Sequence, residues 1–193
     1  MKKYEILKNE YIIVPDGEKV FRVQALVPFA DVGAGEKGGY IQKEENLSQC
    51  GAAWVSGDAW VSGDARVYGD ARVYGNARVY GDAQVSGNAW VYGNAQVYGN
   101  AWVYGNAWVY GDARVSGDAR VQDKVINLMF KEYPVTILQE YIAIGCQTHT
   151  YEDWKNFKDC DIAPMDGPDG IQWWHKYREI ILKTWENNFK EEL

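Results

Sequence analysis

The sequence predicts a mainly β protein whose centre is a triangular solenoid with about 18 residues in each coil. Residues 51–122 consist of twelve consecutive copies of one six-residue unit. The unit reads Gly, Asp or Asn, Ala, a variable residue, Val, and then Tyr, Ser or Gln, and only Ala52 departs from its first two columns. No residue is inserted between copies. A fixed short period of this kind is typical of solenoids, in which each repeat packs against its neighbours.

Each unit predicts one short strand and one corner. Ala and Val lie two residues apart, so both face one side of an extended chain, and the variable residue between them faces the other side. Ala and Val therefore form the inside of the coil. Gly followed by Asp or Asn predicts the corner, because Gly adopts positive φ without strain and Asn and Asp tolerate the left-handed region. Three units close one coil.

The segment before the repeats predicts an N-terminal β cap at residues 1–39. Residues 3–14 and 18–28 indicate two strands, and Pro15-Asp16-Gly17 between them suits a hairpin turn. We expect this hairpin to cover the first coil. Ile41, Leu47 and Ala53 continue the six-residue step, so the solenoid is predicted to begin near residue 40 and to span residues 40–122.

Residues 123–193 predict an α+β segment that caps the solenoid and takes part in oligomerisation. Val135 to Ile144 indicates a hairpin. A short helix is expected from Thr150, its N-cap, through Phe157, followed by a turn through residues 164–168. An amphipathic helix is then predicted from about Asp169 to Lys190.

The repeats resemble those of the hexapeptide-repeat superfamily of left-handed parallel β-helices, whose signature is a large aliphatic residue followed four places later by a small one. The lead-in Gly38-Gly39-Tyr40-Ile41 and the segment 144–150 are similar to hexapeptide-repeat proteins of phages, prophages and bacteria. The resemblance implies a left-handed winding, a homotrimer, and ligand binding in the grooves between subunits. It implies architecture more firmly than activity.

Charge and composition exclude several kinds of partner. The net charge is −7, and residues 123–193 carry 13 acidic and 8 basic side chains. Duplex nucleic acid is not an expected partner, because phosphate neutralisation needs a basic stripe. The first 25 residues contain no uninterrupted apolar segment, so we expect no membrane partner and a cytoplasmic location, in the host cell if the protein is phage-encoded. Three irregularly spaced cysteines suit reduced thiols.

Side chains 18 residues apart are predicted to stack on the outside, about 4.8 Å from one another. The variable column then forms three ladders: Trp54, Arg72, Trp90 and Trp108; Trp60, Arg78, Gln96 and Arg114; and Arg66, Gln84, Trp102 and Arg120. The variable column and the column after Val together are expected to place five Trp and seven Tyr outside the Ala and Val core. Three explanations stay open: self-stacking that stiffens the solenoid, a homotrimer interface, and ligand binding.

These ladders predict a non-catalytic binding protein, a trimeric β-solenoid that binds and sequesters a small nucleotide. Arg suits forked phosphate contacts, and Trp and Tyr suit stacking on bases. The predicted ligand-binding residues are Arg72, Arg78, Arg114, Trp60, Trp90, Trp108, Tyr92 and Tyr110. A role as a phage counter-defence sponge rests on the phage-like resemblance alone. The first alternative is a structural or assembly β-solenoid without a small ligand.

The second alternative is an acyltransferase, the activity of most characterised enzymes in the resembled superfamily. Those enzymes carry a catalytic His in or beside the coils and often a loop over the groove, whereas His149 and His175 both follow the repeats here. His149 could activate Cys146, but we expect a packed thiol and a histidine that anchors the helix after Thr150. The Asp column alternates with Asn and suits turns better than calcium. No catalytic residue, cofactor or metal is predicted.

Overall fold

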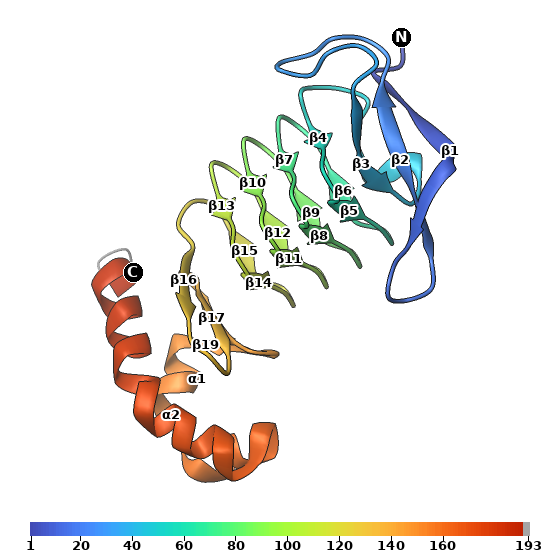
Figure 1. Cartoon of the computed structure of the whole chain (residues 1–193). Helices are drawn as coiled ribbons and strands as arrows, with labels where there is room; N and C mark the ends of the chain where they lie inside the picture. Colours follow the sequence, from blue (N-terminus) through green and yellow to red (C-terminus); the bar gives the residue numbers. More distant parts are fainter. Residues whose placement is uncertain (191–193) are drawn as a thin grey trace. The chain divides into compact units, whose positions relative to one another are not determined.

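The computed structural model describes residues 1–190, which divide into two compact units, Met1–Asn127 and a second unit that begins at Leu128 (Figure 1). The first unit begins with β1 (Tyr4–Ile13), β2 (Lys19–Ala25), β3 (Lys37–Ile41) and the 3₁₀ turn η1 (Glu44–Asn46). Twelve two-residue strands follow, one for each six-residue unit: β4 (Trp54–Val55), β5 (Trp60–Val61), β6 (Arg66–Val67), β7 (Arg72–Val73), β8 (Arg78–Val79), β9 (Gln84–Val85), β10 (Trp90–Val91), β11 (Gln96–Val97), β12 (Trp102–Val103), β13 (Trp108–Val109), β14 (Arg114–Val115) and β15 (Arg120–Val121).

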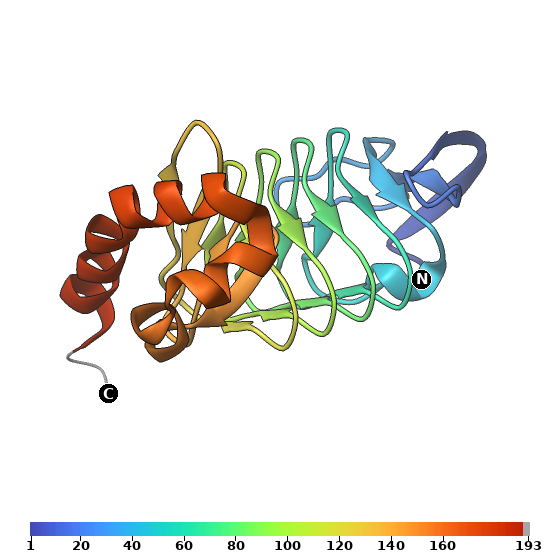
Figure 2. The same cartoon turned by 90° about the horizontal axis from the view of Figure 1, so that it is seen from below.

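These twelve strands form three parallel sheets, and the chain visits each sheet once per coil. One sheet has the order β13-β10-β7-β4, another β15-β12-β9-β6, and the third continues β5-β8-β11-β14. Partners are 18 residues apart, as for Trp90 and Trp108. The hydrogen-bond ladder also passes through the corners, where the Asn94 N–H donates to the Gly111 carbonyl at 2.8 Å. Figure 2 shows the successive coils side by side. The structure confirms the 18-residue circuit.

The core of the solenoid consists of the Ala and Val columns. From Ala53 to Val121 none of these side chains is more than 3% exposed. The corner glycines have φ between 65° and 73°, the region in which a Cβ is strained. The prediction of inward Ala and Val with glycine corners is therefore confirmed.

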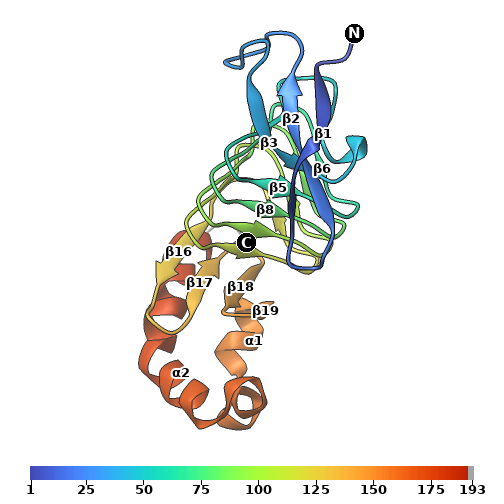
Figure 3. The ribbon, with the colours of Figure 1, turned by 45° about the vertical axis from the view of Figure 1, so that its right-hand side comes forward.

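The N-terminal hairpin extends one of the three sheets. β1 and β2 pair antiparallel, β2 pairs antiparallel with β3, and β3 pairs parallel with β5. The resulting seven-stranded sheet has the order β1-β2-β3-β5-β8-β11-β14, and Figure 3 shows the hairpin beside the first coils. Leu47 forms a parallel bridge with Val67, so the winding begins before the regular repeats, as predicted.

The second unit combines a sheet with two helices. The sheet has the order β16 (Ile126–Met129), β17 (Pro134–Ile137), β18 (Tyr141–Ile144) and β19 (Gln147–Thr150). The predicted hairpin is β17–β18, whereas β19 was not predicted. The helices are α1 (Tyr151–Asn156) and α2 (Asp159–Phe189). Thr150 caps α1 as predicted, since its side chain accepts a hydrogen bond from the Asp153 N–H at 3.1 Å.

The part of α2 after Gly167 agrees with the prediction of a helix from about Asp169, whereas the part from Asp159 to the kink was not predicted. The helix begins ten residues earlier, at Asp159, and is interrupted at Asp166 and Gly167, where φ is −156° and 60°. Pro168 has no backbone N–H to donate, so the break falls where the sequence predicts a turn. None of the helices within residues 1–190 has the length and apolar character that a membrane span needs.

Candidate interaction surface on the solenoid

The predicted ligand-binding residues lie on two faces of the solenoid. We call the outward side of β4, β7, β10 and β13 the first face, and the outward sides of β5, β8, β11, β14 and of β6, β9, β12, β15 the second and third faces. Arg72, Trp90 and Trp108 belong to the first face. Tyr92 and Tyr110 follow its strands, one residue after the inward Val. Trp60, Arg78 and Arg114 belong to the second face. The eight residues therefore do not form one site.

Aromatic rings on the first face stack along the solenoid. Trp90 and Trp108 have centroids 5.7 Å apart and planes inclined by 18°. Tyr74, Tyr92 and Tyr110 form a second stack, with centroid distances of 4.9 Å and 5.5 Å. Burial, and to a lesser extent the neighbouring Tyr92, raise the pKa of the Tyr74 hydroxyl. The two stacks meet edge to face where Tyr74 approaches Trp90 at 5.8 Å.

The first face stays open to solvent at its C-terminal rows. Trp90, Trp108 and Tyr110 are 39%, 53% and 39% exposed. The corners beside these rows carry mainly amides, namely Asn88, Asn94 and Asn106, and one carboxylate, Asp112. The Asn88 side chain donates to Asn106 at 3.2 Å, and Asn94 donates to Asp112 at 2.9 Å. An exposed aromatic surface with few charges is the composition found at the centre of protein interfaces.

The N-terminal rows of the solenoid are covered, which corrects the prediction that all five repeat Trp side chains are exposed. Trp54 is 2% exposed and packs edge to face against Phe29 at 5.3 Å. Trp60 is 8% exposed and packs with Val14, Val20 and Tyr40. Both rings do point away from the Ala and Val core, but the N-terminal segment packs over them. Trp60 therefore offers no open ring face to a base.

Arg72 is also largely covered. Its side chain is 18% exposed and forms an ion pair with Asp31 from the N-terminal cap. A ligand phosphate at Arg72 would have to compete with this carboxylate. The predicted contribution of Arg72 to anion binding is thus weakened by a partner that the repeat pattern does not reveal.

The second face carries its cations beside a tyrosine stack. The rings of Tyr80 and Tyr98 are 5.0 Å apart and almost parallel. The Arg78 guanidinium lies 6.0 Å from the Trp60 ring, a cation–π distance. Arg78 is exposed, Arg114 is half-buried, and Gln96 lies on the strand between them. This face can offer guanidinium groups to an anion.

Ring spacing limits how the stacks could hold a base. Aromatic pairs in contact have centroids about 4.5–7 Å apart. The observed separations of 4.9–5.7 Å on the first face leave no room for a third ring between neighbours. A base therefore does not fit between two rings of the same stack in this conformation. A base could contact only ring edges or the end of a stack.

The two histidines lie in the second unit. His149 packs edge to face against Trp154 at 5.2 Å and Phe157 at 5.0 Å, which supports the prediction that it anchors α1. Burial lowers the pKa of its imidazole, and the opposing effect of Asp153 is smaller. Cys146 is exposed, which corrects the expectation of a packed thiol. His175 is exposed and bonds Asp159 at 2.8 Å. Within residues 1–190, no cluster of His, Cys, Asp or Glu is arranged to hold a metal ion.

Stacked coils, glycine corners and outward ladders define a parallel β-solenoid repeat protein. The sequence model of a family described as YdcK beta solenoid repeat matches this chain at residues 65–81, 71–86, 83–95, 95–111 and 113–127. The matches cover about a third of the chain, and all but the last few residues fall within the six-residue repeats. They agree with the repeat architecture seen in the structure. No curated protein matches the chain.

Proposed function

We propose that this protein is a non-catalytic binding solenoid whose copies associate through the first face into a homotrimer. The observation that carries the proposal is the open surface of Trp90, Trp108 and Tyr110. Association would remove the remaining exposed surface of these three rings from water, and aromatic side chains are enriched at the centre of interfaces. A contiguous exposed apolar surface on a protein is a common mark of an interaction site.

A second copy of the chain is the partner that best suits this surface. The chain carries a net charge of −7, so two copies repel each other wherever acidic surfaces meet. The rows around Trp90 and Trp108 are bordered mainly by neutral Asn side chains, so this face can approach its own copy with little repulsion. The second and third faces carry exposed arginines, Arg78, Arg66 and Arg120, which a self-interface would bring near one another. The trimer is the assembly implied by the resemblance.

Light scattering on wild-type protein and on a Trp90→Ser, Trp108→Ser double variant tests the proposal. One chain has a mass of 21.9 kDa, so a trimer has three times this mass, about 66 kDa. The wild type is expected at the trimer mass and the double variant at the mass of one chain. The control is Trp102→Ser on the third face, where the half-buried ring packs on Tyr104 at 4.9 Å. A monomeric wild type, or a double variant that stays trimeric, would reject the proposal.

The second candidate function is sequestration of a small nucleotide on the second face. It is favoured by exposed Arg78 and by Arg114 two strands away, at about twice the strand spacing of 4.8 Å. A guanidinium group forms forked contacts with a phosphate, so two arginines on one face can each bind one phosphate group. The resemblance to phage proteins suggests the biological role, in which the protein would act as a sponge that sequesters a defence signalling nucleotide. Trp60 is not part of this revised site, because it is buried.

Calorimetry with a panel of cyclic and ADP-ribose-derived nucleotides tests this second candidate. Binding is expected to weaken at least about tenfold in Arg78→Ala, since a charge-assisted contact is lost. Arg66→Ala on the third face is the matched control, because it removes an exposed arginine from an equivalent position. If no nucleotide of the panel gives heat, or both variants weaken binding equally, the second face is not a nucleotide site.

A further inference from the structure

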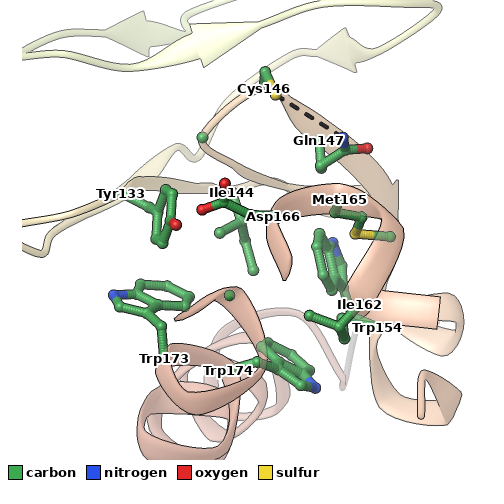
Figure 4. A pocket seen from close by; sticks show the side chains of 12 residues that line it. Tyr133, Ile144, Cys146, Gln147, Trp154, Ile162, Met165, Asp166, Trp173 and Trp174 are labelled. Atoms are coloured by element: carbon green, nitrogen blue, oxygen red, sulfur yellow. Dashed lines mark hydrogen bonds between the residues drawn. The ribbon is translucent and has the colours of Figure 1, made fainter. Parts of the chain in front are cut away.

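The second unit contains a cavity of about 130 Å³ beside the β18–β19 turn, α1 and both parts of α2 (Figure 4). A cavity of roughly 150 Å³ lined by apolar side chains can hold a molecule of the size of benzene. The space therefore suits a small organic group rather than a nucleotide. It lies outside the solenoid, and the first-face proposal does not depend on it.

Aromatic ring surfaces form much of the cavity wall. Tyr133, Trp154, Trp173 and Trp174 all line it. Tyr133 and Trp173 are perpendicular, with centroids 4.9 Å apart, and Trp154 and Trp174 are inclined by 43° at 5.1 Å. Rings at such different angles present surfaces to the same space from several sides. Aromatic faces carry partial negative charge and attract cations.

The indole N–H groups are not directed at this space. The Trp154 N–H donates to the Ile142 carbonyl at 2.7 Å. In Figure 4 the nitrogens of Trp173 and Trp174 point away from the centre of the cavity. The three indoles therefore contribute ring surfaces rather than donors for an anion. Trp174 already has a cation over its ring, since the Arg178 guanidinium lies 5.6 Å from it, and Arg178 is not part of the cavity wall.

A carboxylate lies at the edge of the same cavity because α2 breaks there. Asp166 occupies the non-helical position before Gly167, and Figure 4 shows its carboxylate between Tyr133 and Ile144. Gly170 leaves room for this side chain, since a Cβ at Gly170 would lie 3.0 Å from the Asp166 Cβ. The kink and the glycine together place an exposed acidic group at the edge of the aromatic cavity.

The charge around the cavity favours a positive ligand. In the described part of the chain, the twelve lining residues include Asp166 but no Lys or Arg. From residue 128 onward the chain carries 12 acidic and 7 basic side chains. An anion would meet a carboxylate with no cation among the described lining residues, and a neutral apolar ligand would make no use of that carboxylate. A cation gains from both the rings and the carboxylate.

We propose that this cavity is a binding site for a small organic ammonium ion, with the rings of Tyr133, Trp154, Trp173 and Trp174 around its alkyl groups and Asp166 beside its charge. The contact is non-covalent and involves no chemical step. A trimethylammonium or similar alkylammonium group matches the size of the space. Millimolar affinity is expected, because the site is small and partly open.

Nuclear magnetic resonance titration with choline tests this proposal on the full chain. The control ligand is 3,3-dimethyl-1-butanol, which has the shape of choline and no charge. Choline is expected to shift the indole N–H signals of Trp173 and Trp174, and the alcohol to bind about 3-fold to 30-fold more weakly. No shift with choline at millimolar concentration, or equal binding of the two ligands, would overturn the proposal.

Two variants distinguish a contact with the Asp166 carboxylate from attraction by the overall negative charge of the second unit. Asp166→Asn keeps the side-chain shape and is expected to weaken choline binding at least about 3-fold, with little effect on the alcohol. Asp169→Asn removes an exposed charge of the same helix that does not line the cavity, and is expected to leave binding unchanged. Equal losses in both variants would mean that bulk charge, rather than the cavity, attracts the cation, and would also overturn the proposal.

Discussion

Tyr74 and Tyr92 lie one coil apart, and their rings are parallel within 3° with centroids separated by 4.9 Å. The same spacing separates the strands that carry them, so the backbone ladder sets the geometry of the side-chain ladder. Each such contact contributes about 0.5–1.5 kcal/mol beyond area burial. Self-stacking is therefore present in the fold. It does not account for the rings of Trp90 and Trp108 that remain exposed beside it.

The corner glycines predict a graded cost of substitution. Gly87 has φ 66°, and a Cβ there would lie 2.9 Å from the Gly105 backbone nitrogen in the next coil. Gly117 has nearly the same φ, 65°, but no atom lies within 4 Å of an added Cβ. We expect Gly117→Ala to reduce the free energy of unfolding by about 1–2 kcal/mol, the strain of the left-handed region. Gly87→Ala is expected to cost more, because the coils must also separate.

Urea denaturation followed by circular dichroism measures both corner variants. The difference between them isolates the contact between coils from the strain that they share. Equal losses of stability would mean that close stacking of the corners does not matter.

Because Lys3 is buried, we expect the free energy of unfolding to rise with pH above neutrality. Burial lowers the pKa of its ammonium group from 10.5 to about 8, although the group donates to the Ala53 carbonyl at 2.9 Å. Between about pH 8 and pH 10.5 the unfolded chain therefore holds more protons at this residue than the folded chain. The free energy of unfolding rises with pH in that window. In Lys3→Met this rise should be smaller.

The measurement is the urea midpoint of wild type and Lys3→Met across this pH window. Lys2→Met is the control, because Lys2 is exposed and pairs with Glu44 on the surface. If the Lys3→Met profile parallels that of the wild type, burial does not suppress ionisation at this position.

His149 predicts the loss of stability of the second unit in mild acid. Burial between Trp154 and Phe157 lowers the pKa of the imidazole below 6.5. As the pH falls through 6.5, the unfolded chain gains the proton first, so the free energy of unfolding decreases. His149→Phe keeps a ring against both neighbours and removes the titration. Its denaturation midpoint, followed by tryptophan fluorescence, should vary less between about pH 5 and pH 7 than that of wild type or of the exposed-site variant His175→Gln.

The solenoid could be predicted from the sequence because one pattern specifies it twelve times. Ala and Val in alternation assign the inside, Gly assigns the corner, and every partner is 18 residues away. The winding sense came from the resemblance rather than from the spacing. The exposure of Trp60 could not be predicted in this way, because alternation gives only the direction of the ring relative to the coil. What covers it is a hairpin more than 35 residues earlier, which contributes Val14 and Val20.

The second unit was less predictable because its signals are not repeated. Thr150 and Asp153 form a capping box that can be recognised locally, and the structure contains it. β19 (Gln147–Thr150) is polar and lacks alternation, so nothing in its sequence distinguishes it from a loop. The cavity draws its wall from two strands and two helices, and only the fold brings Tyr133 near Trp173. Among the residues that line the cavity, only Asp166 had a signal in the sequence, because the turn residues around it predict a break in the helix.

The 18-residue circuit, from which the position of every outward side chain follows, can be tested by engineered disulfides. Asn88 and Asn106 lie one coil apart, and their side chains are hydrogen-bonded at 3.2 Å. In a variant whose three natural cysteines are Ser, Asn88→Cys with Asn106→Cys is expected to close one intrachain disulfide, because adjacent coils meet the Cα separation of about 4.4–6.8 Å. Asn94→Cys with Asn106→Cys joins different corners and is expected to stay reduced. Mass spectrometry that found two free thiols in the first pair, or an equally complete disulfide in the second, would contradict the aligned columns and the surfaces built on them.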